Sequence, residues 1–309
     1  MGDSEESGPI APVMILMGVA VLAVSTSSIF VRWSDSAPLT IALFRLFYSC
    51  LLVLPFAVTG PMATRKDLGL MVVSGLSLSA HFFLWITSLS YTSVAESVLL
   101  VTTHPVPVAL ASAYFLRERP NRLQIAGISA AVIGASAIVL LPMLLNPSGG
   151  GDHLFGNLLA FLGSLAMVPY LLIGRKVRPR VGIFRYALTV YGVALGATVV
   201  YVAATGVAWA VTEPKEHALF LTMALIPGLL GHTLYNYLLK HVPAFVVSST
   251  LLFEPVGAAI LAAILLAERP EWYVVLCGAV LIGGLFLIAR GERSRLVNGS
   301  GEMERRSAG

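Results

Sequence analysis

The chain has 309 residues, of which 57% are hydrophobic and 12% charged, and its formal net charge is +4 at pH 7. Soluble domains carry about a quarter of charged residues, so this composition excludes an ordinary water-soluble fold. Long apolar segments follow one another with short gaps, which indicates that lipid is the solvent. The basic residues lie in these gaps and not in one patch, which argues against nucleic-acid binding.

Ten apolar segments are each long enough to cross ~30 Å of hydrocarbon as a helix that rises ~1.5 Å per residue. We expect the spans near residues 10–32, 37–59, 68–90, 93–116, 122–145, 154–176, 182–210, 217–239, 244–267 and 271–290. Residues 1–9 form a polar tail without the basic start and cleavage site of a signal peptide. The fold class predicted is an all-α membrane protein with ten transmembrane helices.

The distribution of lysine and arginine predicts the orientation, because these residues are retained on the cytoplasmic side. With the N-terminus inside, all but four of the 20 basic residues fall in inner loops or tails. Arg32, Lys215 and Arg269 lie outside, and Arg45 lies within a span. We therefore expect a multi-pass protein of the cell membrane with both termini in the cytoplasm.

The two halves of the chain are related. Residues 93–120 can be laid on 243–270 at a constant shift, which pairs Pro105 with Pro255 and ends both segments on Glu-Arg-Pro. Because each repeat would have five spans, an odd number, the repeats are expected to be inverted around a central cavity, with the site near the midplane. The predicted organisation is a tail (1–9), a first repeat (10–145), a linker (146–153), a second repeat (154–290) and a C-terminal tail (291–309).

Four stretches carry a family resemblance: Pro38 to Arg45, Ala95 to Pro105, Leu-Arg-Glu-Arg-Pro ending at Pro120, and Phe-Glu-Pro-Val followed by Leu-Leu-Ala-Glu-Arg-Pro ending at Pro270. On these the chain resembles the drug/metabolite transporter superfamily, in particular its ten-span proteins with two EamA domains. The resemblance implies a cavity lined by spans 1, 3, 4, 6, 8 and 9, and export of amino acids, other metabolites or drugs, often on the proton gradient. In one departure, Ser25-Thr26-Ser27-Ser28 replaces the Trp-Gly-x-Asn pattern of many members.

Ionisable side chains at membrane depth cost about 2.5–3.5 kcal/mol on insertion scales, so each is expected to be partnered or used. Glu254 lies ~15 Å into its span, near the midplane, and His104 is its repeat mate. Each precedes a proline, Pro255 or Pro105, whose missing N–H breaks the helix and frees carbonyls. This pair predicts a proton or substrate site. The alternative is a packed imidazole and a protonated carboxyl group.

Other polar and aromatic side chains are expected to line the same cavity: His81 and Trp85 of span 3, Tyr170 of span 6, and His232, Tyr235 and Asn236 of span 8. Residues four apart share a helix face, and polar faces point into a bundle, although interhelical hydrogen bonding would explain them equally well. Arg45 and Glu96 are expected at a similar depth near the outer end, where an ion pair would act as a clamp or an outer gate.

These features predict a secondary transporter that moves a small metabolite, an amino acid or drug-like molecule, by alternating access, as an exporter coupled to protons. The alternatives are a channel or non-transporting scaffold and, less favoured, a membrane enzyme. The sequence has no His-Glu-x-x-His motif and no long loop for a catalytic face. The expected partners are the substrate, protons and the bilayer, with no cofactor, metal or nucleic acid. Gly127, Gly134, Gly278 and Gly284 permit close helix approach, within or between protomers.

Overall fold

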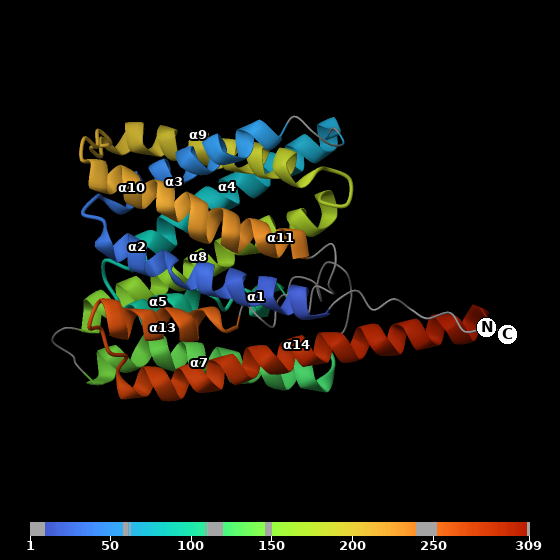
Figure 1. Ribbon diagram of the computed structural model, residues 1–309. Helices are drawn as coiled ribbons and strands as arrows, with labels where there is room; N and C mark the ends of the chain where they lie inside the picture. The colour runs from blue at the N-terminus through green and yellow to red at the C-terminus, as the bar shows by residue number, and fades with distance from the viewer. Residues whose placement is uncertain are drawn as a thin grey trace.

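The computed structural model describes residues 10–57, 61, 63–108, 110, 120–145, 150–238 and 252–307. Within this part of the chain every regular element is a helix, which confirms the all-α prediction (Figure 1). In chain order the elements are α1 (Ile10–Ser25), α2 (Ser27–Trp33), α3 (Pro38–Val53), the 3-10 turn η1 (Leu54–Phe56), α4 (Arg65–Ser88), α5 (Val94–Val101), α7 (Arg122–Leu145), α8 (Gly150–Val177), α9 (Ile183–Thr205), α10 (Pro214–Met223), the π-helix η2 (Ala224–Thr233), α11 (Leu234–Leu238), α13 (Glu254–Leu265) and α14 (Trp272–Ser307).

Seven helices of the described residues are long and apolar enough to cross a membrane: Ile15–Trp33, Pro38–Phe56, Arg65–Ser88, Arg122–Pro142, Gly151–Gly174, Ile183–Thr205 and Trp272–Gly291. The shorter apolar helices Val94–Val108 and Glu254–Leu265 accompany them. The elements α10, η2 and α11 form one further uninterrupted helical run. The arrangement is therefore compatible with the expected ten spans.

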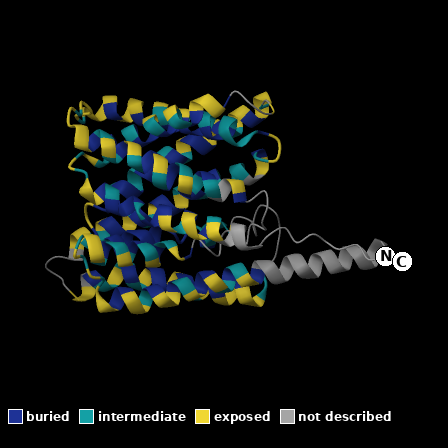
Figure 2. Cartoon of the chain, in the orientation of Figure 1, coloured by how far each residue is buried: buried dark blue, intermediate teal, exposed yellow. Residues whose placement is uncertain are grey.

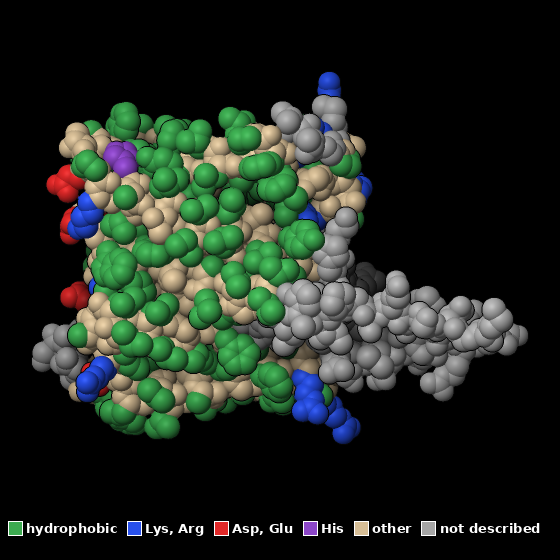
Figure 3. Space-filling view, in the orientation of Figure 1, with side chains coloured by type: hydrophobic (Ala, Val, Ile, Leu, Met, Phe, Trp, Pro, Cys, Tyr) green, Lys and Arg blue, Asp and Glu red, His purple; other side chains and the backbone are tan. Residues whose placement is uncertain are grey.

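The surface between the two ends of the bundle is apolar. Large hydrophobic side chains such as Val200, Ile133 and Ile264 are more than half exposed along the outer helix faces (Figure 2). On the face drawn in Figure 3, charged side chains gather at the two ends of the bundle and hydrophobic side chains cover the region between them. Such a surface would be unfavourable in water, and it matches the hydrocarbon of a bilayer.

Several helices are interrupted in the interior of the bundle. The first span breaks at Thr26, whose hydroxyl donates to the Ala23 carbonyl at 2.7 Å. The run from α10 to α11 widens into the π-helix η2, which contains Pro227. A proline has no N–H to donate and its ring crowds the preceding turn, so a wider turn relieves the conflict, and π-helical turns are frequent at functional sites.

The two repeat-related prolines also mark helix ends. α5 stops at Val101, and a turn through Thr102, Thr103 and His104 precedes Pro105, where a short helical segment begins. α13 begins at Glu254, with Pro255 in its first turn. Proline is favoured at the first position of a helix, because the N–H there has no intrahelical acceptor.

The glycines of α7 and α14 pack these two helices against each other within one chain. A Cβ atom at Gly127 would lie 2.5 Å from the Gly284 carbonyl oxygen, and one at Gly134 would lie 2.8 Å from the Cys277 carbonyl oxygen. Distances this short require glycine, since the backbones themselves are in contact. The small residues noted in the sequence thus serve packing between the fifth and the last predicted spans.

Replacing Gly284 by alanine is expected to destabilise the protein by about 1–3 kcal/mol, because the added methyl group would meet the Ala131 nitrogen at 2.5 Å and the backbones would have to separate. Gly283→Ala is the matched control, since a Cβ atom there meets nothing within 4 Å. Thermal unfolding in detergent should show a lower Tm for Gly284→Ala alone. Equal Tm values for the two variants would contradict the tight α7–α14 contact.

Candidate functional site

Ionisable side chains from five segments of the chain converge inside the bundle. Arg45 of α3 lies within electrostatic range of Glu254, the first residue of α13. His232 of η2 interacts electrostatically with the same arginine. It also interacts with His81 of α4 and with His104 in the turn after α5. We refer to these five residues as the central cluster.

Arg45 is the most buried member of the central cluster, with 2% of its surface exposed. Its Nη1 donates to the Ser27 hydroxyl at 2.8 Å, and its Cζ lies 4.4 Å from the centre of the Phe82 ring and 5.8 Å from that of Trp85. A guanidinium over aromatic rings is stabilised by the ring electrons, which offsets part of its desolvation. Within the described residues, the Ser27 hydroxyl provides the one hydrogen bond of this guanidinium.

Two further buried donors belong to Trp85, which lies beside Arg45, and to Ser28, which follows Ser27 in the chain. Trp85 Nε1 and the Ser28 hydroxyl have no hydrogen-bond partner within the described part of the chain, and both residues are at least nine-tenths buried. Buried polar groups in native proteins are nearly always paired, so unpaired ones call for an explanation. Together with the Arg45 guanidinium, they make this region rich in hydrogen-bond donors.

The imidazoles of His81 and His104 are oriented by backbone carbonyls. His81 Nδ1 lies 2.9 Å from the Gly163 carbonyl oxygen, and His104 Nδ1 lies 3.3 Å from the Val101 carbonyl oxygen. A carbonyl oxygen only accepts, so Nδ1 carries the hydrogen in each ring. In the neutral form Nε2 is then left with its lone pair, and each ring can take up a proton there. His81 also stacks on Trp85, with ring centres 6.3 Å apart.

Glu254 occupies the N-terminus of α13, where the helix dipole favours negative charge. Its side chain is partly accessible, and no hydrogen bond joins its carboxyl group to the described residues. Its backbone carbonyl instead accepts from the Ser25 hydroxyl at 3.3 Å, which connects α13 to the break in the first span.

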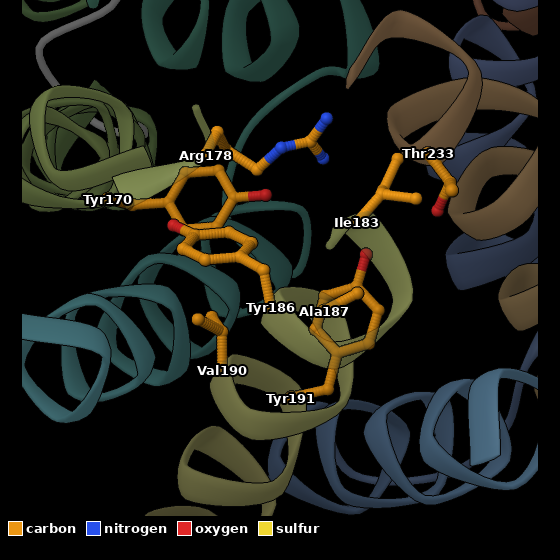
Figure 4. Close-up of a pocket in the computed structure, with 8 residues that line it drawn as sticks. All are labelled: Tyr170, Arg178, Ile183, Tyr186, Ala187, Val190, Tyr191 and Thr233. Carbon is orange, nitrogen blue, oxygen red and sulfur yellow. The ribbon is translucent and has the colours of Figure 1, made fainter. Parts of the chain in front are cut away.

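A small cavity adjoins the central cluster between α8, α9 and η2 (Figure 4). It has a volume of about 10 Å³ and is lined by Tyr170, Arg178, Ile183, Tyr186, Ala187, Val190, Tyr191 and Thr233. Tyr191 connects it to the cluster, because this side chain is within electrostatic range of Arg45. A volume of this size is room for roughly one water molecule. In this structure the cavity therefore has no room for a larger solute.

The structure brings together most of the residues proposed from the sequence. The central cluster contains Arg45, His81, His104, His232 and Glu254, Trp85 flanks it, and Tyr170 lines the adjoining cavity. Tyr235 and Asn236 belong to α11, and their side chains lie outside the described residues. The position of Arg45 differs from expectation, since its span was not expected to line the cavity.

The expected ion pair between Glu96 and Arg45 is not formed. The Glu96 carboxylate accepts from the Tyr273 hydroxyl at 2.8 Å, from His153 Nδ1 at 3.0 Å and from the Thr92 hydroxyl. The reason is local, because Glu96 is the third residue of α5 and closes a capping box with Ser93. Its carboxylate is thereby directed to the helix N-terminus, while Arg45 turns inward over Phe82.

Carboxylates link the two halves of the chain at this end of the bundle, which we call the acidic end. Besides Glu96, Glu268 contacts Arg32 at 3.2 Å and accepts from the Val94 backbone N–H. Sequence reasoning did not assign these contacts. Residues 93–96 read Ser-Val-Ala-Glu, which is the sequence pattern of a capping box, and this pattern predicts that the Glu96 carboxylate turns back to the start of its helix.

Glu216 is a third carboxylate of the acidic end, and it is 97% buried at the start of α10. It accepts from the hydroxyls of Ser34 and Ser36 and, at 3.2 Å, from the Asp35 backbone N–H. Burial acts to raise the pKa of Glu216, but these three hydrogen bonds favour the ionised form and their combined effect leaves the pKa below its ordinary value.

The opposite end, which we call the basic end, carries basic residues at the start of α4, at the end of α8 and on the turn that follows it, and at the start of α9: Arg65, Lys66, Lys176, Arg178, Arg180 and Arg185. Here Asp67 of α4 accepts from Arg180 Nη2 at 2.6 Å and caps its own helix with Thr64. This ion pair also joins the first half of the chain to the second.

The fold and this interior site together define a polytopic membrane protein with a polar centre. The model of the EamA-like transporter family matches residues 11–140 and again residues 154–290, and the chain belongs to this family. The uncharacterized transporter YetK of Bacillus subtilis is 26% identical over 233 residues, which cover 74% of this chain and 69% of YetK. An uncharacterized transporter of Archaeoglobus fulgidus is 24% identical over 288 residues, which cover 88% of this chain and 96% of that protein.

The fold also matches a crystal structure of a protein with a TM-score of 0.60, over 90% of this chain and 97% of that one, at 17% identity. Family and relatives confirm the resemblance stated from the sequence and point to a non-enzymatic membrane transporter with a small-molecule substrate.

Replacing Glu216 by glutamine is expected to lower the free energy of unfolding by about 1–3 kcal/mol near pH 7, because three hydrogen bonds to a charged acceptor are weakened. Since its pKa is depressed in the folded state, the stabilisation is complete above the ordinary value of 4.5 and is lost as the pH falls through the folded pKa.

Thermal unfolding in detergent between about pH 3 and about pH 7 should therefore show that the Tm values of the wild type and of Glu216→Gln converge at low pH. Glu213→Gln, an exposed neighbour, is the control. A difference in Tm that stays constant across this range would refute the role given to the Glu216 charge.

Proposed function

We propose that the protein is a secondary transporter that moves a small metabolite by alternating access, with the central cluster as its substrate and proton site. One observation supports this above the others. Arg45, His81 and His104 of the first half and His232 and Glu254 of the second half meet inside the bundle. Ionisable groups at membrane depth are costly, and in transporters they mark substrate and ion pathways.

Alternating access requires contacts between the two halves that can break at one end while they hold at the other. The carboxylate contacts of the acidic end are one such set, and the pair of Asp67 and Arg180 at the basic end belongs to the other. In this structure both sets are formed, and the cavity next to the basic end holds about 10 Å³. This is the geometry expected of an occluded carrier, whereas a channel needs a continuous polar path.

The chemistry of the central cluster suits coupling to protons. Glu254 is a carboxyl group that can exist in a neutral and a charged form, and we assign the coupling proton to it. Arg45 keeps its charge and interacts with Glu254, so protonation of the carboxyl group changes the field that a bound substrate experiences. A substrate and a proton that compete for this region would be exchanged across the membrane.

The proposal extends to topology and direction. Ten spans in two inverted repeats would place the basic end and both termini in the cytoplasm, as the positive-inside rule requires, and the acidic end outside a cell membrane. The protein would then export its substrate, an amino acid or drug-like molecule, in exchange for protons. Pro105 and Pro255 would mark the starts of the helical segments next to His104 and Glu254.

Glu254→Gln is expected to abolish proton-coupled transport while leaving expression and Tm close to those of the wild type, because the amide keeps the shape of the carboxyl group and cannot titrate. In proteoliposomes with a pH gradient, the wild type should accumulate its substrate against a concentration gradient, and the variant should show exchange without accumulation. Glu271→Gln, an exposed carboxyl group of the acidic end, is the matched control.

Wild-type accumulation by Glu254→Gln would refute the role of this residue. Downhill flux without any accumulation by the wild-type protein would favour a channel, and the absence of flux for every solute tested would favour a scaffold.

A further inference from the structure

The break in the first span places two serine hydroxyls on different sides of one helix. Thr26 interrupts the helix, since its N–H donates to the Ala23 carbonyl at 3.3 Å, three residues back instead of four. Ser25 ends α1 and Ser27 begins α2, and both side chains are more than nine-tenths buried. Each residue turns a helix by ~100°, so residues two apart point in nearly opposite directions. The two hydroxyls therefore contact different helices.

Ser27 restrains the position of the central arginine. Its hydroxyl accepts from Arg45 Nη1 at 2.8 Å, and the Arg45 Cζ lies 4.4 Å from the centre of the Phe82 ring. The hydroxyl belongs to α2 and the ring to α4, so the guanidinium is held by contacts with two helices. Loss of the hydroxyl would leave the ring contact, which fixes a guanidinium less precisely than a hydrogen bond does.

Ser25 restrains the start of α13, the helix that begins at Glu254. Its hydroxyl lies 2.8 Å from the Val21 carbonyl oxygen and 3.3 Å from the Glu254 backbone carbonyl oxygen, and it donates to both. A Cβ atom at Gly257 would lie 2.9 Å from the Ser25 Cβ, so α13 approaches the first span as closely as a glycine allows. α13 packs against both α1 and α2 (Figure 1). The backbone that carries the Glu254 carboxyl group is therefore fixed to the break.

The break thus holds two groups of opposite charge without joining them. Arg45 and Glu254 interact electrostatically, yet the ion pairs in the described part of the chain are formed by other residues. Opposite charges attract more strongly in a protein interior than in water, so an ionised Glu254 and Arg45 would approach each other unless they were restrained. The contacts of Ser27 and Ser25 supply a restraint on each side.

The helices that pack against α13 carry few other charges near its start. α13 packs against α1, α2 and α5, and α1 has no ionisable side chain. Arg32 of α2 and Glu96 of α5 are engaged in the contacts of the acidic end. His104, in the turn after α5, is oriented by a backbone carbonyl. Among the described residues, Arg45 is therefore the charge that acts on Glu254.

We propose that Ser27 and Ser25 are positioning residues that keep the Arg45 guanidinium and the Glu254 carboxyl group apart, so that Glu254 binds a proton instead of forming an ion pair. This inference rests on the coupling role proposed above for Glu254, and it adds the residues that control the proton affinity of that site. The break in the first span then has a function beyond packing, because it sets the distance between the two charges.

The first measurement follows the ionisation of Glu254 in the full chain reconstituted in proteoliposomes. A neutral carboxyl group has a C=O stretching band in the infrared that a carboxylate lacks, and the part of this band that Glu254→Gln removes belongs to Glu254. Its intensity against pH gives a midpoint. Ser27→Ala should move this midpoint down by about one pH unit, because the released guanidinium approaches the carboxylate and favours its charged form.

Three further variants separate positioning from general loss of structure. Ser25→Ala should move the midpoint in the same direction and by less, since it releases the backbone of Glu254 and not the guanidinium. Ser27→Thr keeps the hydroxyl and should retain the wild-type midpoint. Thr26→Val is the matched control, because it removes a hydroxyl of the same break that donates to the Ala23 carbonyl. It should retain the wild-type midpoint whatever its effect on Tm. If Ser27→Ala is not folded, Ser25→Ala is compared with Thr26→Val.

The second measurement is proton-driven accumulation in the same proteoliposomes, with labelled amino acids and the fluorescent cation ethidium as probes. For a probe that the wild type accumulates, the pH of half-maximal accumulation should move in Ser27→Ala in the same direction as the infrared midpoint. A merely structural role would lower the amount accumulated at every pH without moving the midpoint.

An infrared midpoint of Ser27→Ala that equals or exceeds that of the wild type would overturn this inference, and so would an equal shift in Thr26→Val. Accumulation by the wild type combined with unchanged midpoints would leave the transport function standing and sink the positioning role. The expected midpoints without accumulation of any probe by the wild type would support the positioning role and count against the transport function.

Discussion

A charged side chain inside a bundle that lipid surrounds costs free energy, and the contacts of Arg45 in the interior of this protein reduce that cost. Arg45 is almost completely buried, and its charge is accommodated by the Phe82 ring, the Ser27 hydroxyl and the field of Glu254. Among the described residues these contacts include one hydrogen bond to the guanidinium, and we propose that a ligand supplies others. A charge that serves stability alone would be expected to have a close and complete set of partners, as Asp67 has at the basic end.

Helix breaks surround the central cluster and provide its polar backbone. The first span breaks at Thr26, α5 stops before Pro105, α13 starts at Glu254, and η2 widens around Pro227. Irregular backbone at membrane depth is tolerated only inside protein or beside a polar cavity, since lipid offers no hydrogen bonds. For example, the Ser25 hydroxyl beside the break in the first span donates a hydrogen bond to the Glu254 backbone carbonyl at the start of α13.

The N-terminus of α5 shows how the two halves are coupled at the acidic end. Glu96 caps this helix from within and receives the Tyr273 hydroxyl of the second half. Glu268 accepts from the Val94 N–H from the other side. Ala267, with φ of 54°, adopts the left-handed conformation that turns the chain after α13 and brings Glu268 to this position. Since α5 leads directly to His104, a movement that releases these carboxylates would be transmitted to the central cluster.

The sequence alone determined the helical membrane class, the family and the set of ionisable residues at membrane depth, because hydropathy and depth depend only on residue type and position along a helix. Distance along the span predicts that His104 and Glu254 lie near the midplane. Only the tertiary structure decided that Arg45 belongs with them and not with Glu96, and that η2 brings His232 within electrostatic range of the arginine. It also decided that Arg178 lines one cavity with three tyrosines. The direction in which a side chain points around its helix axis depends on which helices pack against it, and those neighbours come from distant parts of the chain.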